Sequence, residues 1–286
     1  MAYSTITKPS LYFNTKIYSG NNGTQTITGV GFQPDWVWFK SRSTTDSHYL
    51  VDAVRGNTKY IRSSGTNAEE TNSTAVTSFN ADGYALGSAG NVNDNANYVS
   101  WNWKANGQGS ANTDGSINTT YTSVNTTSGI SICKWSGSGA NATIGHGLGV
   151  VPQMIITKSM ASSSWCVYHE ALGNTKTIFL ESNGVGNTHI AYYNNTSPTS
   201  SVFTVGTDDA VNHSGNDMIA YCFANVKGYS KFGSYTGNGN ADGTFIYTGF
   251  KPAFIIIKES SNARDWIMVD NKRDVDNVVS NRLFPN

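Results

Sequence analysis

The chain has 286 residues, 30.8 kDa and a formal net charge of zero, and only 13% of its residues are charged. This balance argues against binding to nucleic acid or to an anionic membrane surface, and the apolar runs are too short to span a bilayer. Asn, Gly, Ser and Thr fill 125 positions and form helices poorly, whereas the abundant Val, Ile, Tyr, Trp and Phe favour strands, so the composition predicts an all-β fold.

The first predicted element is an extended segment over residues 1–17. Extended segments at a chain terminus are easily donated to a partner. We therefore expect residues 1–17 to act as a tether that attaches the chain to a larger assembly.

A Gly-x-x-Pro-x5-Lys frame then occurs three times along the chain. Its members are Gly31, Pro34 and Lys40, then Gly149, Pro152 and Lys158, then Gly249, Pro252 and Lys258. The Gly fits a turn that needs positive φ, and Pro belongs at the first residue of a strand or on an edge because it lacks a ladder donor. The frame is therefore an architectural motif: a turn starts a core strand, and the Lys marks where that strand meets solvent.

Further marks keep the same order around each frame. An aromatic-hydroxyl-Gly turn precedes it at residues 18–20, 135–137 and 235–237, and a second short strand follows it at residues 48–52, 165–169 and 266–270. Two more strands, at residues 79–86 and 98–103, are echoed only once, at 202–205 and 218–223. Short strands separated by turns are typical of sandwiches.

We therefore predict tandem antiparallel β-sandwich repeats of the jelly-roll or lectin-like kind. Repeat one spans residues 18–107, a Gly/Ser/Asn/Thr-rich linker spans 108–129, repeat two spans 130–232 and a partial repeat three spans 233–286.

The third repeat stops before its last two strands. An incomplete sandwich leaves an open edge and an uncovered apolar face, which invites pairing with another chain. Either the sequence is a truncated form, or the missing strands come from the segment Tyr12–Ile17 or from a neighbouring subunit. We therefore expect a homo-oligomer.

These marks, with the opening stretch 8–20, resemble a family of uncharacterised virion proteins of marine bacteriophages. The most family-like stretch is Ile27–Lys40, supported by residues 47–56, 78–84 and 98–103. The resemblance implies repeated lectin-like sandwiches on tail fibres, tail tips or capsid surfaces, and so a protein located in the virion.

A search for reactive groups yields no catalytic, metal or cofactor site. The five histidines have no metal spacing, and the three cysteines lack CxxC spacing, so we expect the cysteines to be ordinary small apolar residues. Residues 238–243 fit the first half of a calcium loop, but the twelfth position is Gly249 instead of Glu, which favours a turn.

Aromatic residues are the remaining candidates for a binding role. We expect the pairs Trp36 and Trp38, and Trp101 and Trp103, to lie in the core, since the repeats have apolar residues at the same points. Tyr192 and Tyr193, beside Asn194 and Asn195, are expected to be exposed and to contact a glycan or receptor.

Taken together, the sequence predicts a non-enzymatic phage virion structural protein on the particle surface. The first expectation is a tail fibre or tail-tip adhesin that contacts a glycan or protein of the host and joins other virion proteins through its N-terminal segment. One alternative is a capsid decoration or fibre protein. The other is a polysaccharide depolymerase, for which two carboxylates should face a cleft about 5 to 9.5 Å apart.

Overall fold

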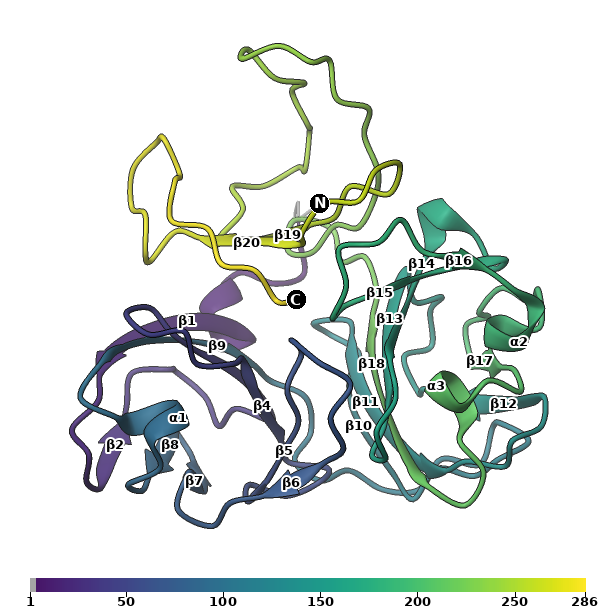
Figure 1. Ribbon diagram of the computed structural model, residues 1–286, viewed down its shortest axis with the longest axis horizontal. Coiled ribbons are helices and arrows are strands. Elements are labelled where there is room, and N and C mark those ends of the chain that lie inside the picture. The colour runs from purple at the N-terminus through teal and green to yellow at the C-terminus, as the bar shows by residue number, and fades with distance from the viewer. Residues whose placement is uncertain (1–3) are drawn as a thin grey trace.

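Two β-sandwiches and a smaller third lobe make up the computed structural model, which describes residues 4–286 (Figure 1). The chain is all-β, as predicted, with three helices of four residues each in the described part. No helix among residues 4–286 has the length and apolar character of a membrane span. Residues 1–3 of the predicted tether lie outside the described residues.

The first sandwich packs a four-stranded sheet against a three-stranded one. The four-stranded sheet has the order β1 (Phe13–Ser19), β9 (Asn97–Trp103), β3 (Trp36–Ser41), β4 (Tyr49–Asp52). The other has the order β2 (Gln25–Ile27), β8 (Gly83–Leu86), β7 (Val76–Asn80). Smaller elements are η1 (Pro9–Leu11), β5 (Lys59–Tyr60), β6 (Glu70–Thr71) and α1 (Gly90–Asn93).

The second sandwich repeats this plan with a wider main sheet. That sheet has the order β10 (Tyr121–Asn125), β11 (Ile130–Ser136), β18 (Asp217–Phe223), β13 (Met154–Ser159), β14 (Trp165–His169), β15 (Lys176–Phe179), β16 (Asn187–Thr188). The facing sheet is β12 (Ala142–Gly145) with β17 (Val202–Val205). Its helices are η2 (Glu170–Leu172), α2 (Ile190–Tyr193) and α3 (Asp209–Asn212).

The third lobe contains a single hairpin, β19 (Phe254–Ile257) with β20 (Ile267–Asp270). The three hairpins β3–β4, β13–β14 and β19–β20 share one register, because Trp36 pairs with Asp52, Met154 with His169, and Phe254 with Asp270. The repeats seen in the sequence are thus repeats of structure.

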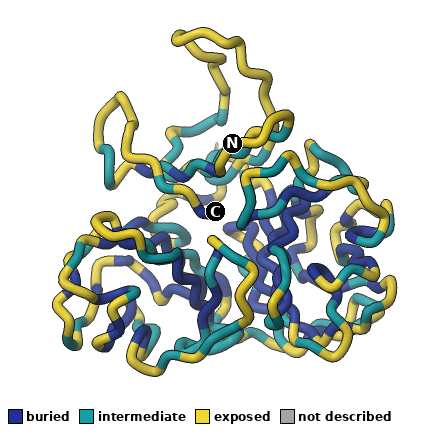
Figure 2. The backbone as a smooth tube through the Cα atoms, viewed as in Figure 1, coloured by how far each residue is buried: buried dark blue, intermediate teal, exposed yellow. Residues whose placement is uncertain are grey.

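One apolar core joins all three lobes. Successive strand residues point to opposite faces. One face of each hairpin therefore points to this shared core, and the other face points away from it. The shared core draws buried residues from each lobe, among them Trp36, Trp38, Trp101, Ile156, Tyr221, Trp266 and Met268. Buried backbone is concentrated in the two sandwiches, and the third lobe is mostly exposed (Figure 2).

A ring of hydrogen bonds closes the three repeats around this core. Trp165 of repeat two donates from Nε1 to the carbonyl of Arg62 in repeat one, at 2.9 Å. Trp266 of repeat three likewise donates from Nε1 to the carbonyl of Phe179 in repeat two, at 2.9 Å. His48 of repeat one lies 2.9 Å from the carbonyl of Phe284 in repeat three, through Nε2.

The donors and acceptors of this ring occupy equivalent positions. The donors follow the frame Lys by eight, seven and eight residues. In each repeat a residue of the second hairpin strand pairs with a later residue: Leu50 with Ile61, Val167 with Ile178, and Met268 with Leu283. The acceptor carbonyl belongs to the residue that directly follows this later residue, which is Arg62, Phe179 or Phe284. The chain is therefore a pseudo-threefold ring made from one polypeptide.

Buried Asp–Arg pairs link neighbouring repeats in the same direction. Asp52 accepts from Arg55 Nε at 2.6 Å and from the hydroxyl of Tyr221, in repeat two, at 2.7 Å. Asp270 accepts from Arg273 Nε at 2.6 Å and from Trp101 Nε1, in repeat one, at 3.0 Å. A buried charge needs such partners, because desolvation costs several kcal/mol per ion.

Two predicted boundaries are wrong. Residues 13–17 of the predicted tether belong to β1, which pairs with β9 along its whole length, so these residues are part of the first sandwich and give no strand to the third repeat. The predicted linker 108–129 contains β10, which pairs with β11, and its residues Ser110 and Ile117 form further bridges.

The repeated frame builds a turn and a strand, with one correction. Gly31, Gly149 and Gly249 all have positive φ, at 92°, 72° and 83°. Each Pro stands two residues before its strand instead of at the first strand residue.

The Lys does not simply meet solvent: the Lys40, Lys158 and Lys258 amines all donate to the carbonyl of the next residue. Lys158 is fully buried, which lowers the pKa of its amine to about 8.

Replacing Asp52 with Asn should lower the free energy of unfolding by about 3 kcal/mol, because the buried Arg55 would lose its closest carboxylate and keep only Glu69, at 3.3 Å. Urea unfolding measures the change. The matched control is Asp242→Asn on an exposed loop, which should shift stability by less than about 0.5 kcal/mol. Equal effects of the two changes would contradict the role given to Asp52.

Candidate functional site: the open face of the third repeat

The third repeat leaves a strand edge unpaired. In the first two repeats the frame strand has two neighbours, since β3 lies between β9 and β4, and β13 lies between β18 and β14. Within residues 4–286, β19 pairs only with β20. Unpaired edges present a row of backbone donors and acceptors that can pair with another chain.

The outward face of this hairpin is also uncovered. Ile255 occupies the position of Val37 and Ile155, which are buried beneath the second sheets of their own sandwiches. Ile255 is 39% exposed. The sequence thus keeps an apolar residue where the third repeat provides no second sheet among the described residues.

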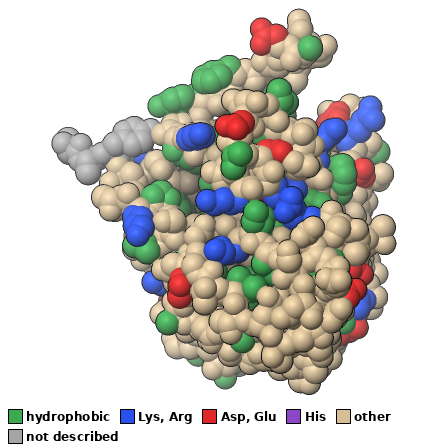
Figure 3. Space-filling view, turned by 90° about the vertical axis from the view of Figure 1, so that its left-hand side faces the viewer, with side chains coloured by type: hydrophobic (Ala, Val, Ile, Leu, Met, Phe, Trp, Pro, Cys, Tyr) green, Lys and Arg blue, Asp and Glu red, His purple; other side chains and the backbone are tan. Residues whose placement is uncertain are grey.

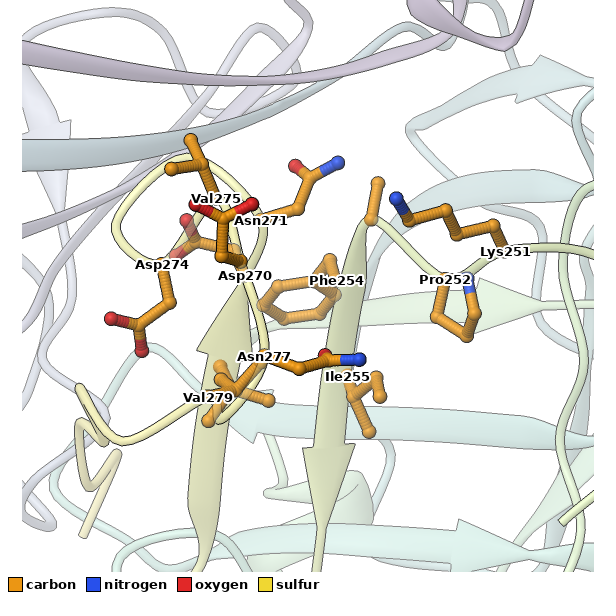
Figure 4. A pocket seen from close by; sticks show the side chains of 13 residues that line it. Lys251, Pro252, Phe254, Ile255, Asp270, Asn271, Asp274, Val275, Asn277 and Val279 are labelled. Atoms are coloured by element: carbon orange, nitrogen blue, oxygen red, sulfur yellow. The ribbon is translucent and has the colours of Figure 1, made fainter. Parts of the chain in front are cut away.

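A hollow of about 230 Å³ lies over this face (Figure 4). Its lining includes Lys251, Pro252, Phe254, Ile255, Asp274, Val275 and Val279. The loop after β20 supplies the valines, and the frame turn supplies Lys251 and Pro252. The hollow therefore combines apolar walls with a few charged groups at its margins.

More apolar side chains of the third lobe are exposed, and apolar groups lie along the projecting lobe in Figure 3. Phe245 is 87% exposed, and Tyr247, Val275 and Val278 are also exposed. Phe245 and Tyr247 lie between Tyr235 and Gly249, where the first two repeats place β2 and β12. A concentration of exposed apolar groups marks an interaction surface.

Two of the three acids that line the hollow, Asp270 and Asp274, hold the protein's own structure. Asp270 is engaged by Arg273 and Trp101. Asp274 accepts backbone hydrogen bonds from Asn281 and Ser280, which lower the pKa of its carboxyl. Both carboxylates are thus used to fix the loop after β20.

The predicted contact tyrosines are not exposed, so that prediction is wrong. Tyr192 and Tyr193 are 8% and 5% exposed and pack in the core of the second sandwich. They belong to α2, which the sequence analysis missed, and Tyr193 bonds to the hydroxyl of Thr177. Asn194 and Asn195 end this helix with positive φ, and only Asn195 is fully exposed.

The other residues considered in the sequence lie in the core or in a turn. Cys133, Cys166 and Cys222 are free and buried, as predicted, and so are Trp36, Trp38 and Trp101. Residues 238–243 form a turn in which Asn238 and Asn240 accept from backbone amides. In the described part of the chain, no three His, Cys, Asp or Glu side chains gather as metal ligands do.

Sequence comparison adds a family. A family model described as Domain of unknown function (DUF7483) matches residues 8–286. The chain belongs to this family. The DUF7483 region includes both sandwiches and the third lobe. No curated protein and no solved structure matches the chain.

The sequence analysis missed the Asp–Arg pairs, although a signal for them exists in this DUF7483 sequence. Asp52 and Arg55, and Asp270 and Arg273, share an Asp-x-x-Arg spacing at the end of the second hairpin strand. Repeat two has His169 and Leu172 at these positions. Two copies out of three were therefore visible as a motif.

His48 should make stability fall in acid. It accepts from Trp38 Nε1 at 2.7 Å, and burial lowers its pKa to about 3. In the unfolded chain the imidazole binds a proton near pH 6.5, whereas in the folded chain it stays neutral. The free energy of unfolding should therefore fall by about 1.4 kcal/mol for each pH unit between pH 6 and pH 4.

His48→Gln keeps a donor and an acceptor but cannot titrate. Urea unfolding of both proteins across this pH range should show the stability advantage of the wild type shrinking toward acid. A constant difference between them would contradict the buried neutral imidazole.

Proposed function

We propose that the chain is a non-enzymatic structural component of a bacteriophage virion, exposed on the particle surface. The first candidate is a tail fibre or tail-tip adhesin that contacts a glycan or protein of the host surface. The resemblance of residues 8–104 to phage virion proteins supports this proposal, and the fold is compatible with it.

The observation that carries the structural role is how the buried polar groups are used. Asp52 and Asp270 each hold an Arg and an aromatic donor from another repeat, and His48 links Trp38 to the third lobe. Asp52, Asp270 and His48 thus join the three repeats. Such a framework suits a protein that must keep its shape on a particle.

Attachment to the particle is proposed to use the third repeat. Residues 9–11 and 13–17 of the N-terminal segment first considered for this role are occupied in η1 and β1. The open hairpin edge and the exposed residues Phe245 and Tyr247 are better placed for contacts with other virion proteins or with further copies of the chain.

Locating the chain in purified particles tests the proposal. Mass spectrometry should detect it in intact virions at a fixed copy number, and gold-labelled antibodies should mark the tail end. The folded chain, added in excess, should lower adsorption of particles to host cells, while the chain denatured by heat should not. Detection in infected cells but never in purified particles would overturn the proposal.

The same experiment separates the alternatives. Label on the head would favour the capsid decoration or fibre protein. Release of reducing sugars from host polysaccharide by the purified chain would favour the depolymerase and contradict the non-enzymatic role.

A further inference from the structure

The third repeat has no counterpart of β9 and β18 among residues 4–286, but it keeps the two segments that would lie on either side of such a strand. In repeat one β9 lies between β1 and β3, and in repeat two β18 lies between β11 and β13. Alignment of Tyr235 with Tyr18 and Trp135 places residues 230–236 at the position of β1 and β11. Residues 230–236 and β19 form no ladder with each other.

The first of these neighbours is held against the shared core. Phe232 stands three residues before Tyr235, as Ile132 stands before Trp135, and both pack against that core. The ring of Phe232 lies 5.9 Å from the ring of Phe223. This flank therefore occupies its place although no strand pairs with it.

We propose that the unpaired edge of β19 accepts a β-strand from outside residues 4–286. Its occupant is an extended segment with the pattern of the repeats' own closing strands, β9 and β18. These two strands show what such an edge binds in this fold, because each pairs along six residues of its frame strand. Addition of a strand to a sheet edge supplies affinity through backbone hydrogen bonds, and side-chain pockets supply specificity.

The register of the complete repeats fixes the side chains of the incoming strand. Trp103 pairs with Trp36, and Trp101 pairs with Trp38. Phe254 and Ile256 stand at these two frame positions in repeat three. The incoming strand should therefore place two large apolar residues, two positions apart, opposite Phe254 and Ile256.

The contacts between repeats also indicate which polar group the incoming strand should contact. Tyr221 of repeat two reaches Asp52 of repeat one, and Trp101 of repeat one reaches Asp270 of repeat three. The equivalent residue of the incoming strand should then reach repeat two at His169. Since His169 Nδ1 accepts from the Ala171 amide, its Nε2–H is left to donate, which suits a tyrosine hydroxyl better than an indole.

A synthetic peptide tests the proposal on the full chain. The probe is residues 217–223 with Cys222→Ser, which contains Tyr221. It should bind saturably in fluorescence anisotropy and slow hydrogen exchange of the Phe254 and Ile256 amides, which point to the open edge, by about tenfold or more. The same peptide with Ile219→Pro should not bind, because the amide of residue 219 points to the frame strand and Pro removes that ladder donor.

Two matched variants of the chain test whether the peptide binds at β19. Ile255→Asp, at the exposed face of β19, should weaken binding by about tenfold or more, whereas Val150→Asp, at a turn of repeat two, should leave binding unchanged. Both sites are exposed, and circular dichroism checks that both variants fold.

Three results would overturn the proposal. The first is absence of saturable binding by the folded chain. The second is strong protection, in the free monomer, of the Phe254 and Ile256 amides, which point to the open edge; it would mean that the chain already covers this edge. The third is concentration-dependent self-association that protects β19, which would assign the edge to a second copy instead.

Discussion

The alternation of side chains along three short hairpins governs this structure. One face of each hairpin must enter a core that no single repeat can close, so the three repeats share it. The Trp165 and Trp266 indoles and the His48 ring, which are buried polar groups that need partners, find them in a neighbouring repeat. The pairing of Asp52 with Tyr221 and of Asp270 with Trp101 then fixes how neighbouring repeats are oriented.

The sequence was sufficient to predict the all-β fold and the repeated frame, because Gly and Pro constrain the backbone locally and strands alternate with period two. It was not sufficient for contacts between repeats. Tyr192 and Tyr193 beside two Asn residues suggested a loop, yet the chain forms α2 there and buries both rings. Residues 13–17 looked detached because their partner β9 is some eighty residues away in sequence.

The third repeat follows the same rules with fewer strands. It retains the hairpin residues that face the shared core, so it closes the ring. It also retains the outward residue Ile255, for which the described chain supplies no cover. The loss of the Asp–Arg pair from repeat two fits this arrangement, because His169 lies where the closing strand of repeat three would reach. The proposed strand-binding edge thus lies where the internal symmetry is broken.

The central claim is that three repeats form one cooperative unit around a shared core. Hydrogen exchange, followed by mass spectrometry across a series of urea concentrations, tests it most directly. We predict that β3, β13 and the two β19 amides bonded to β20, those of Ile255 and Ile257, lose their slow exchange at the same urea concentration, since none of the three inner faces is covered without the others. Loss of protection in β3 while β13 stays fully protected would contradict the account.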